Sequence, residues 1–152
     1  MAFLLERPPG RSLVSSWSLP SVLRCLAEAP FEPLHKATLL HLTFTAFFLF
    51  AFASGQGRSF LQALSMEPGL LRWEIPGVRL IPRASFIAKN QTASSGSVEI
   101  FLPSLASHSS VEEDKVWCPV RALIRWYLSR TKSFRSSSDL FVTTTAPHKA
   151  AS

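Results

Sequence analysis

The chain has 152 residues, of which 47% are hydrophobic and 17% are charged. This length is enough for one domain with its own core, and the composition excludes a globally disordered chain, which combines low hydrophobicity with high charge. The formal net charge of +6 suits a polyanionic partner, most simply the phosphates of a nucleic acid.

Residues 1–16 are expected to form a flexible lead-in, because they contain Pro8-Pro9-Gly10 and scattered serines. They lack the basic stretch and long apolar segment of a secretory signal peptide. The folded domain is therefore expected over residues 17–152. Its first helix should begin near Ser18, which suits an N-cap, with Pro20 in the first turn.

A second helix is predicted over residues 36–54, followed by a further helical turn over residues 59–64. The apolar run at residues 37–53 raises the alternative of a membrane span. It is shorter than the roughly 20 apolar residues that a span needs, and it contains His41 and three threonines. A buried central helix is therefore favoured, and no membrane partner is expected.

The middle of the chain changes to the pattern of β-strands. Three short strands are predicted at residues 78–81, 85–88 and 98–102, with a loop of turn-forming residues at 90–97 between the last two. The expected fold class is α+β, with helices packed around a small three-stranded antiparallel sheet.

The clearest helix is predicted over residues 119–132, with Pro119 at its first position. Its apolar residues recur at the spacing of one buried stripe. They are Val120, Leu123, Ile124, Tyr127 and Leu128. A short strand or extended piece is expected at residues 139–142, and residues 143–152 should form a polar tail.

The basic excess lies in this last quarter. The segment from Lys115 to Ser152 holds seven basic residues and one acid, Asp139, and so carries the whole net charge. The cations expected to contact DNA phosphates are Arg121, Arg125, Arg130, Lys132, Arg135 and Lys149. A solvated basic face without a partner is the alternative.

Three pieces of the sequence together resemble the catalytic domain of tyrosine recombinases of the phage-integrase type, with the flavour of the DIRS and Crypton transposons. The first runs from Trp17 to Leu34, and the second from Thr45 to Leu64 (TAFFLFAFASGQGRSFLQAL). The third and most specific is Cys118-Pro119-Val120-Arg121-Ala122-Leu123, continuing to Tyr127-Leu128, Arg130-Thr131-Lys132, Leu140-Phe141-Val142 and Pro147-His148-Lys149. The resemblance covers nearly the whole chain after residue 16 and implies the N-terminal part of that domain.

The resemblance implies DNA binding and DNA recombination or integration of a mobile element, without a metal or other cofactor. In that family a tyrosine attacks the scissile phosphate, arginines stabilise the charge that develops on it, and a hairpin lysine acts as general acid. Lys89 matches the lysine. The family's first arginine aligns with Gly57, while Arg58 follows one residue late, which rotates a helical side chain by about 100°.

The family's His-x-x-Arg motif and nucleophilic tyrosine lie beyond the segment that matches, since the chain ends four residues after His148. The single tyrosine, Tyr127, falls on the buried stripe. We therefore expect a truncated, inactive recombinase-like domain that binds double-stranded DNA, with homo-oligomerisation on DNA left open.

The resemblance places the chain inside the cell, in the nucleus. The two cysteines, Cys25 and Cys118, suit buried free thiols in a reducing compartment better than a disulfide framework. A non-catalytic DNA-binding or interaction module and a small membrane-associated protein remain as alternatives.

Overall fold

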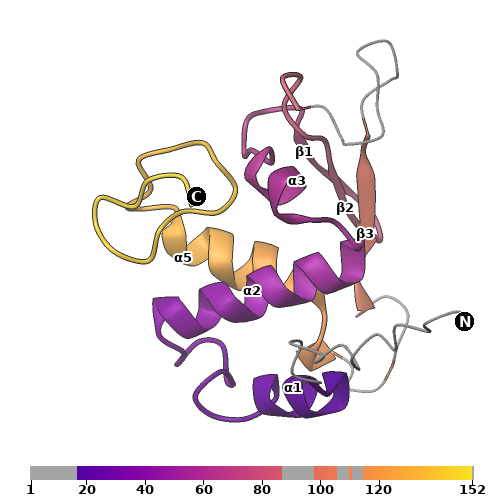
Figure 1. Cartoon of the computed structure of the whole chain (residues 1–152), viewed down its shortest axis with the longest axis vertical. Helices are drawn as coiled ribbons and strands as arrows, with labels where there is room; N and C mark the ends of the chain where they lie inside the picture. Colours follow the sequence, from indigo (N-terminus) through magenta and orange to yellow (C-terminus); the bar gives the residue numbers. More distant parts are fainter. Residues whose placement is uncertain (1–16, 87–97, 106–109, 111–114, 152) are drawn as a thin grey trace, which may run out of the picture.

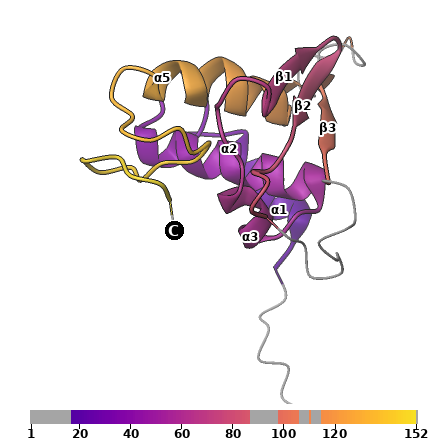
Figure 2. The ribbon, with the colours of Figure 1, turned by 90° about the horizontal axis from the view of Figure 1, so that it is seen from above.

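The computed structural model describes residues 17–86, 98–105, 110 and 115–151. Two helices form its centre: α2 (Leu39–Ser54), and η2 (Arg121–Leu128), which α5 (Ser129–Thr131) extends. Figures 1 and 2 show this pair lying side by side, with a small sheet at one end. The shorter helices are α1 (Leu19–Leu26) and α3 (Arg58–Gln62).

Helix α2 has clear stop and start signals in its sequence. The side chain of Thr38 caps it by accepting a hydrogen bond of 3.3 Å from the backbone N–H of His41. Gly55 ends it in the left-handed conformation, with φ of 64°. The predicted central helix is thus confirmed, with its first turn three residues later than expected.

Apolar residues lie on all sides of α2. This pattern predicts a helix that is buried all round, but the structure buries only one side of it. One side packs into the core through Leu42, Ala46, Leu49 and Phe50. On the other side Leu40, Phe44, Phe47 and Phe52 are exposed. Across the described ranges, the structure contains no helix that is both long enough and apolar enough to span a membrane.

The sheet contains three antiparallel strands in the order β1 (Leu71–Glu74), β2 (Gly77–Leu80) and β3 (Ile100–Pro103). The expected mixture of helices with a small three-stranded antiparallel sheet is confirmed. The predicted strands at 78–81 and 98–102 correspond to β2 and β3.

The prediction of a strand at residues 85–88 is wrong for Ser85 and Phe86, and residues 87 and 88 lie outside the described part. Pro82 has no N–H to donate to a ladder, and the chain turns away after β2. The N–H of Arg83 bonds the carbonyl of Ala63, and the N–H of Phe86 bonds the carbonyl of Arg83, both at 2.9 Å. The third strand of the sheet is instead β1, which was not predicted from the sequence.

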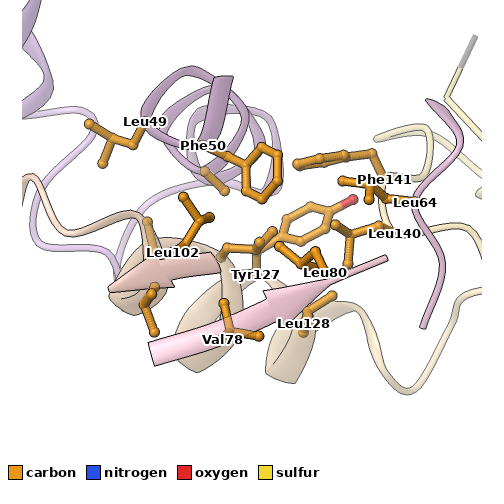
Figure 3. Close-up of a cluster of buried hydrophobic side chains, with 14 of the residues drawn as sticks. Leu49, Phe50, Leu64, Val78, Leu80, Leu102, Tyr127, Leu128, Leu140 and Phe141 are labelled. Carbon is orange, nitrogen blue, oxygen red and sulfur yellow. The ribbon is translucent and has the colours of Figure 1, made fainter. Parts of the chain in front are cut away.

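The hydrophobic core lies between α2, η2 and one face of the sheet, as Figure 3 shows. Val78, Leu80 and Leu102 of the sheet point into it. Tyr127 of η2 lies at its centre, with its ring centroid 5.5 Å from that of Phe141. The core therefore unites the helical and strand halves of the chain in one domain.

The helix predicted at 119–132 is present, but residues 121–128 form a π-helix where an α-helix was expected. Its apolar stripe is confirmed, since Val120, Leu123, Tyr127 and Leu128 are buried and Ile124 is partly buried. Extended π-helices are rare and occur often at functional sites. Apolar spacing alone does not distinguish the two forms.

Two smaller expectations need correction. Residues 143–151 are not a loose tail but fold back as a loop, in which the N–H of Thr143 bonds the carbonyl of Lys149 at 2.8 Å and the N–H of Ala151 bonds that of Phe141 at 3.0 Å. Both cysteines are free, but only Cys118 is buried, while Cys25 is exposed on α1.

Candidate nucleic-acid interface

A groove of about 480 Å³ lies where the end of the sheet meets the beginning of η2. The basic side chains of Lys115, Arg121 and Arg125 line it, and none of the lining residues within the described part of the chain is acidic. The others are Trp73, Ser104, Val116, Cys118 and Val120. We call this set of eight residues the basic groove. It offers positive charge beside an aromatic surface, the combination that binds nucleic acids.

The fold positions the two arginines of the basic groove on η2, one helical turn apart. The guanidinium of Arg121 donates to both carboxylate oxygens of Glu32, at 2.8 and 3.3 Å. Both side chains are partly buried, so the pair holds the loop after α1 against η2. Arg125 is exposed, and its guanidinium lies 5.9 Å from the centre of the Trp126 ring. Arg125 is therefore the more available cation.

Beneath them, the thiol of Cys118 is part of the framework. Its sulfur accepts hydrogen bonds from the backbone N–H groups of Leu105 and Arg121, at 3.3 and 3.4 Å. These bonds tie the segment after β3 to the start of the helix, and so fix two sides of the basic groove relative to one another.

The aromatic wall of the basic groove is Trp73, which is 62% exposed. Trp73 pairs with Val78 across β1 and β2, so both side chains lie on the face of the sheet that faces the core. Val78 is covered by the core, whereas Trp73 lies one pair from the end of the hairpin and remains in contact with solvent.

A smaller pocket of about 230 Å³ continues the basic groove toward the β1–β2 turn. It shares Trp73, Ser104 and Val120 with the basic groove, and adds Ile75, Pro76 and Gly77. Ile75 is fully exposed. The basic groove thus opens at one end onto an apolar turn.

The two residues predicted for catalysis lie elsewhere. Lys89 is outside the described residues. Arg58 is the exposed first residue of α3 and lines a separate cavity of about 300 Å³ with Phe47, Leu61, Gln62, Asp139, Phe141, Ala150 and Ala151. No residue of this cavity lines the basic groove. The structure therefore does not bring Arg58 together with Arg121 and Arg125.

Gly57 is the N-cap of α3 and has φ of −82° and ψ of 172°, which any residue adopts. A Cβ built on it would meet no atom within 4 Å. Neither backbone conformation nor crowding requires a glycine at this position. The fold would therefore accept the arginine that the resemblance places here.

Asp139 lines the same cavity as Arg58. Its carboxylate forms an ion pair with Arg83 at 2.5 Å and accepts a hydrogen bond from Ser137. Burial raises the pKa of this carboxyl, but the bond from Ser137 and the pairing with Arg83 outweigh burial and hold its pKa below the ordinary value. Asp139 and Arg83 thus join the C-terminal segment to the chain after β2.

The other residues predicted to contact DNA are Arg130, Lys132, Lys149 and Arg135. Arg130 donates to the backbone carbonyl of Ala37, and Lys132 and Lys149 are exposed. Arg135 has a structural role instead. Its guanidinium donates to the carbonyls of Asp139 and Leu140, at 2.6 and 3.3 Å, and to the hydroxyl of Thr131 at 2.6 Å. We therefore do not carry Arg135 into the proposed interface.

Tyr127 is confirmed as a core residue. Its side chain is fully buried, and its hydroxyl oxygen accepts a hydrogen bond of 2.9 Å from the N–H of Val142. Burial raises the pKa of this phenol, which keeps it protonated and weakly nucleophilic. A buried phenol with its oxygen engaged cannot reach a DNA phosphate.

Trp73, Ile75 and Lys115 are the members of this region that the sequence analysis missed. The run Leu71-Arg72-Trp73-Glu74 alternates apolar and charged residues, which was the available signal of a strand. It is only four residues long, and the Ile75-Pro76 turn lacks the Asn-Gly or Gly-rich signal of a tight hairpin.

Within the described ranges, no three histidine, cysteine or acidic side chains lie together in an arrangement that could hold a metal ion. Comparison of the chain with protein-family models, curated proteins and solved structures finds no significant match.

Proposed function

We propose that this chain binds double-stranded DNA through the basic groove and does not itself cleave a strand. The single observation that carries the proposal is the gathering of Lys115, Arg121 and Arg125 around one concave surface. The motif resemblance to tyrosine recombinases supports the same partner. On this proposal the chain takes part in recombination or integration of a mobile element, in the nucleus.

The groove suits the backbone of DNA better than a small anion. Arginine side chains one helical turn apart can reach successive phosphates, and each contact releases condensed counterions. Such contacts give affinity and orientation but carry no sequence information. Specificity would have to come from base contacts or from DNA deformation.

Two features of these 152 residues support the proposed absence of strand cleavage. Tyr127 is the single tyrosine of the chain, and its hydroxyl is buried and hydrogen-bonded in the core. Gly57 stands where the resemblance requires an arginine to stabilise charge on the phosphate. A domain with both features binds DNA without forming a phosphotyrosine.

The test measures the affinity for a short random-sequence duplex by fluorescence anisotropy at increasing concentrations of KCl. With one to three phosphate contacts at about 0.9 per contact, the slope of log affinity against log salt should lie between about −1 and −3. No binding at low salt would refute the proposal. A nicked suicide substrate should give no covalent protein–DNA adduct, and an adduct would overturn the second half.

A second candidate function, a protein-interaction module, is favoured by the exposed apolar face of α2. Leu40, Phe44 and Phe52 are each about half exposed, at 48, 57 and 53%. Contiguous exposed apolar residues mark interaction surfaces. Sedimentation at increasing concentration tests its simplest form, self-association: Phe44→Glu should abolish it, and a monomer at all concentrations would remove it.

A further inference from the structure

The turn between β1 and β2 presents an apolar tip to solvent. Ile75 is 100% exposed, and Trp73, two residues before it, is 62% exposed. A single exposed isoleucine needs no explanation. Two large apolar residues at the end of one hairpin, next to a groove lined by cations, form a more specific arrangement.

The tip stands on a rigid base. The N–H of Ser104 donates to the carbonyl of Pro76 at 2.8 Å, which fixes the turn to the end of β3. Across the hairpin, the guanidinium of Arg79 donates to both oxygens of Glu74, at 2.8 and 2.9 Å. A wedge held in this way loses little conformational freedom on binding.

Gly77 shows how closely this base is packed. A Cβ at Gly77 would lie 2.0 Å from the backbone oxygen of Leu102, so only a glycine lets β2 approach β3 here. The close approach sets the position of Ile75 by backbone contacts, which do not adjust as flexible side chains do.

The tip also lies beside the cations. The pocket that contains Ile75 shares Trp73, Ser104 and Val120 with the basic groove. A duplex whose phosphates contact Arg125 in the basic groove therefore lies against the tip. Duplex DNA is the occupant favoured by this charge complementarity.

We propose that Ile75 enters the base stack of DNA bound in the basic groove, unstacks one base step and kinks the duplex. Apolar side chains such as isoleucine and proline act in this way in architectural DNA-binding proteins. The inference rests on the proposed DNA binding and deepens it. The cations supply affinity, and the wedge favours steps that unstack at low cost, such as TA and CA.

The test uses the full chain and a duplex that carries 2-aminopurine at successive positions, since this base fluoresces more strongly when it is unstacked. A second duplex with a fluorophore at each end reports bending by energy transfer. Wild-type protein should raise the 2-aminopurine signal and bring the ends closer. Ile75→Ala should lose both signals and bind about tenfold more weakly, with an unchanged salt slope.

Trp17→Ala is the control, because it removes a large apolar side chain that is 61% exposed and that lines neither the basic groove nor the pocket at the β1–β2 turn. It should behave like the wild type. If Ile75→Ala keeps the fluorescence rise, or if wild-type protein binds with the expected salt slope but unstacks nothing, the wedge is overturned while DNA binding stands. Preference for single-stranded DNA would also overturn it. No binding at low salt would overturn both proposals.

Discussion

Glu32→Gln should strengthen DNA binding, although it removes a stabilising contact. Glu32 occupies the guanidinium of Arg121, with contacts of 2.8 and 3.3 Å, and also accepts from the N–H of Leu34 at 3.0 Å. The neutral amide has one acceptor oxygen, so it cannot replace all these bonds. Arg121 then becomes available to a phosphate in the basic groove.

The expected magnitudes follow from this geometry. One added phosphate contact steepens the salt slope by about 0.9, which corresponds to about five- to tenfold tighter binding near 0.1 M salt. Loss of the charged bonds should lower the free energy of unfolding by about 1–2 kcal/mol, or the melting temperature by about 2–8 °C. Anisotropy titrations and thermal unfolding followed by circular dichroism measure the two effects.

Glu28→Gln is the control, because it removes the same charge from an exposed residue four positions earlier. It should leave the salt slope unchanged. The double variant Glu32→Gln/Arg121→Ala should lose the gain in affinity. If Glu32→Gln only destabilises the protein and binds DNA no more tightly than Glu28→Gln, Arg121 is a structural residue and the proposed role is wrong.

Three other regions give predictions. Tyr127→Phe should lower the free energy of unfolding in urea by about 1–2 kcal/mol, because a buried N–H loses its acceptor, and an unchanged value would contradict that hydrogen bond. The absorbance of the Tyr127 phenolate should appear only above the ordinary pKa of 10.0, because burial raises the pKa of this phenol. The stability that the buried phenol contributes is therefore present below pH 10 and is lost as the pH rises through the pKa of the folded state. Asp139 has a lowered pKa, so its contribution is present above the ordinary 3.8 and lost as pH falls through the folded value; Asp139→Asn should flatten the acid limb of stability against pH, and an unchanged limb would exclude this carboxyl as its source. Gly77→Ala should cost about 3 kcal/mol, because its methyl group meets a backbone oxygen at 2.0 Å. Gly57→Ala should cost about 1 kcal/mol or less, because its methyl group meets no atom and only the N-cap preference for glycine over alanine is lost; equal effects in denaturant melts would refute the packing argument.

The elements with strong periodicity or caps could be predicted from the sequence. Thr38 and Gly55 bound α2, and the apolar stripe with Tyr127 marks the helix after Pro119. In both cases local signals and burial agree, so tertiary packing only confirms what the pattern indicates.

Elements fixed by distant contacts could not be predicted. The segment at Phe86 has strand-forming residues, but the chain forms a turn there instead. The ring of Phe86 packs against that of Phe60, with the two centroids 5.5 Å apart. Residues Leu71 to Glu74 alternate apolar and charged side chains, but a run of four residues becomes a strand only through its pairing with β2. Strand propensity is decided by such partners more than by the segment itself.

The candidate site shows the same division. Arg121 and Arg125 could be predicted because a basic helix face is visible in the sequence. Arg135 looked equivalent, but its donors bind carbonyls within the chain. Charge can be counted along a sequence, whereas the availability of a guanidinium depends on which acceptors the fold brings to it.

The central claim is that the basic groove binds DNA phosphates, and paired salt titrations of Arg125→Ala and Arg72→Ala test it most directly. Both variants remove one arginine. Arg72, however, lies on the face of β1 opposite to Trp73, and its guanidinium donates to the carbonyl of Gly69 at 3.0 Å. We predict that the salt slope falls by about 0.9 for Arg125→Ala and stays unchanged for Arg72→Ala. Equal slopes for both variants and the wild type would contradict the claim.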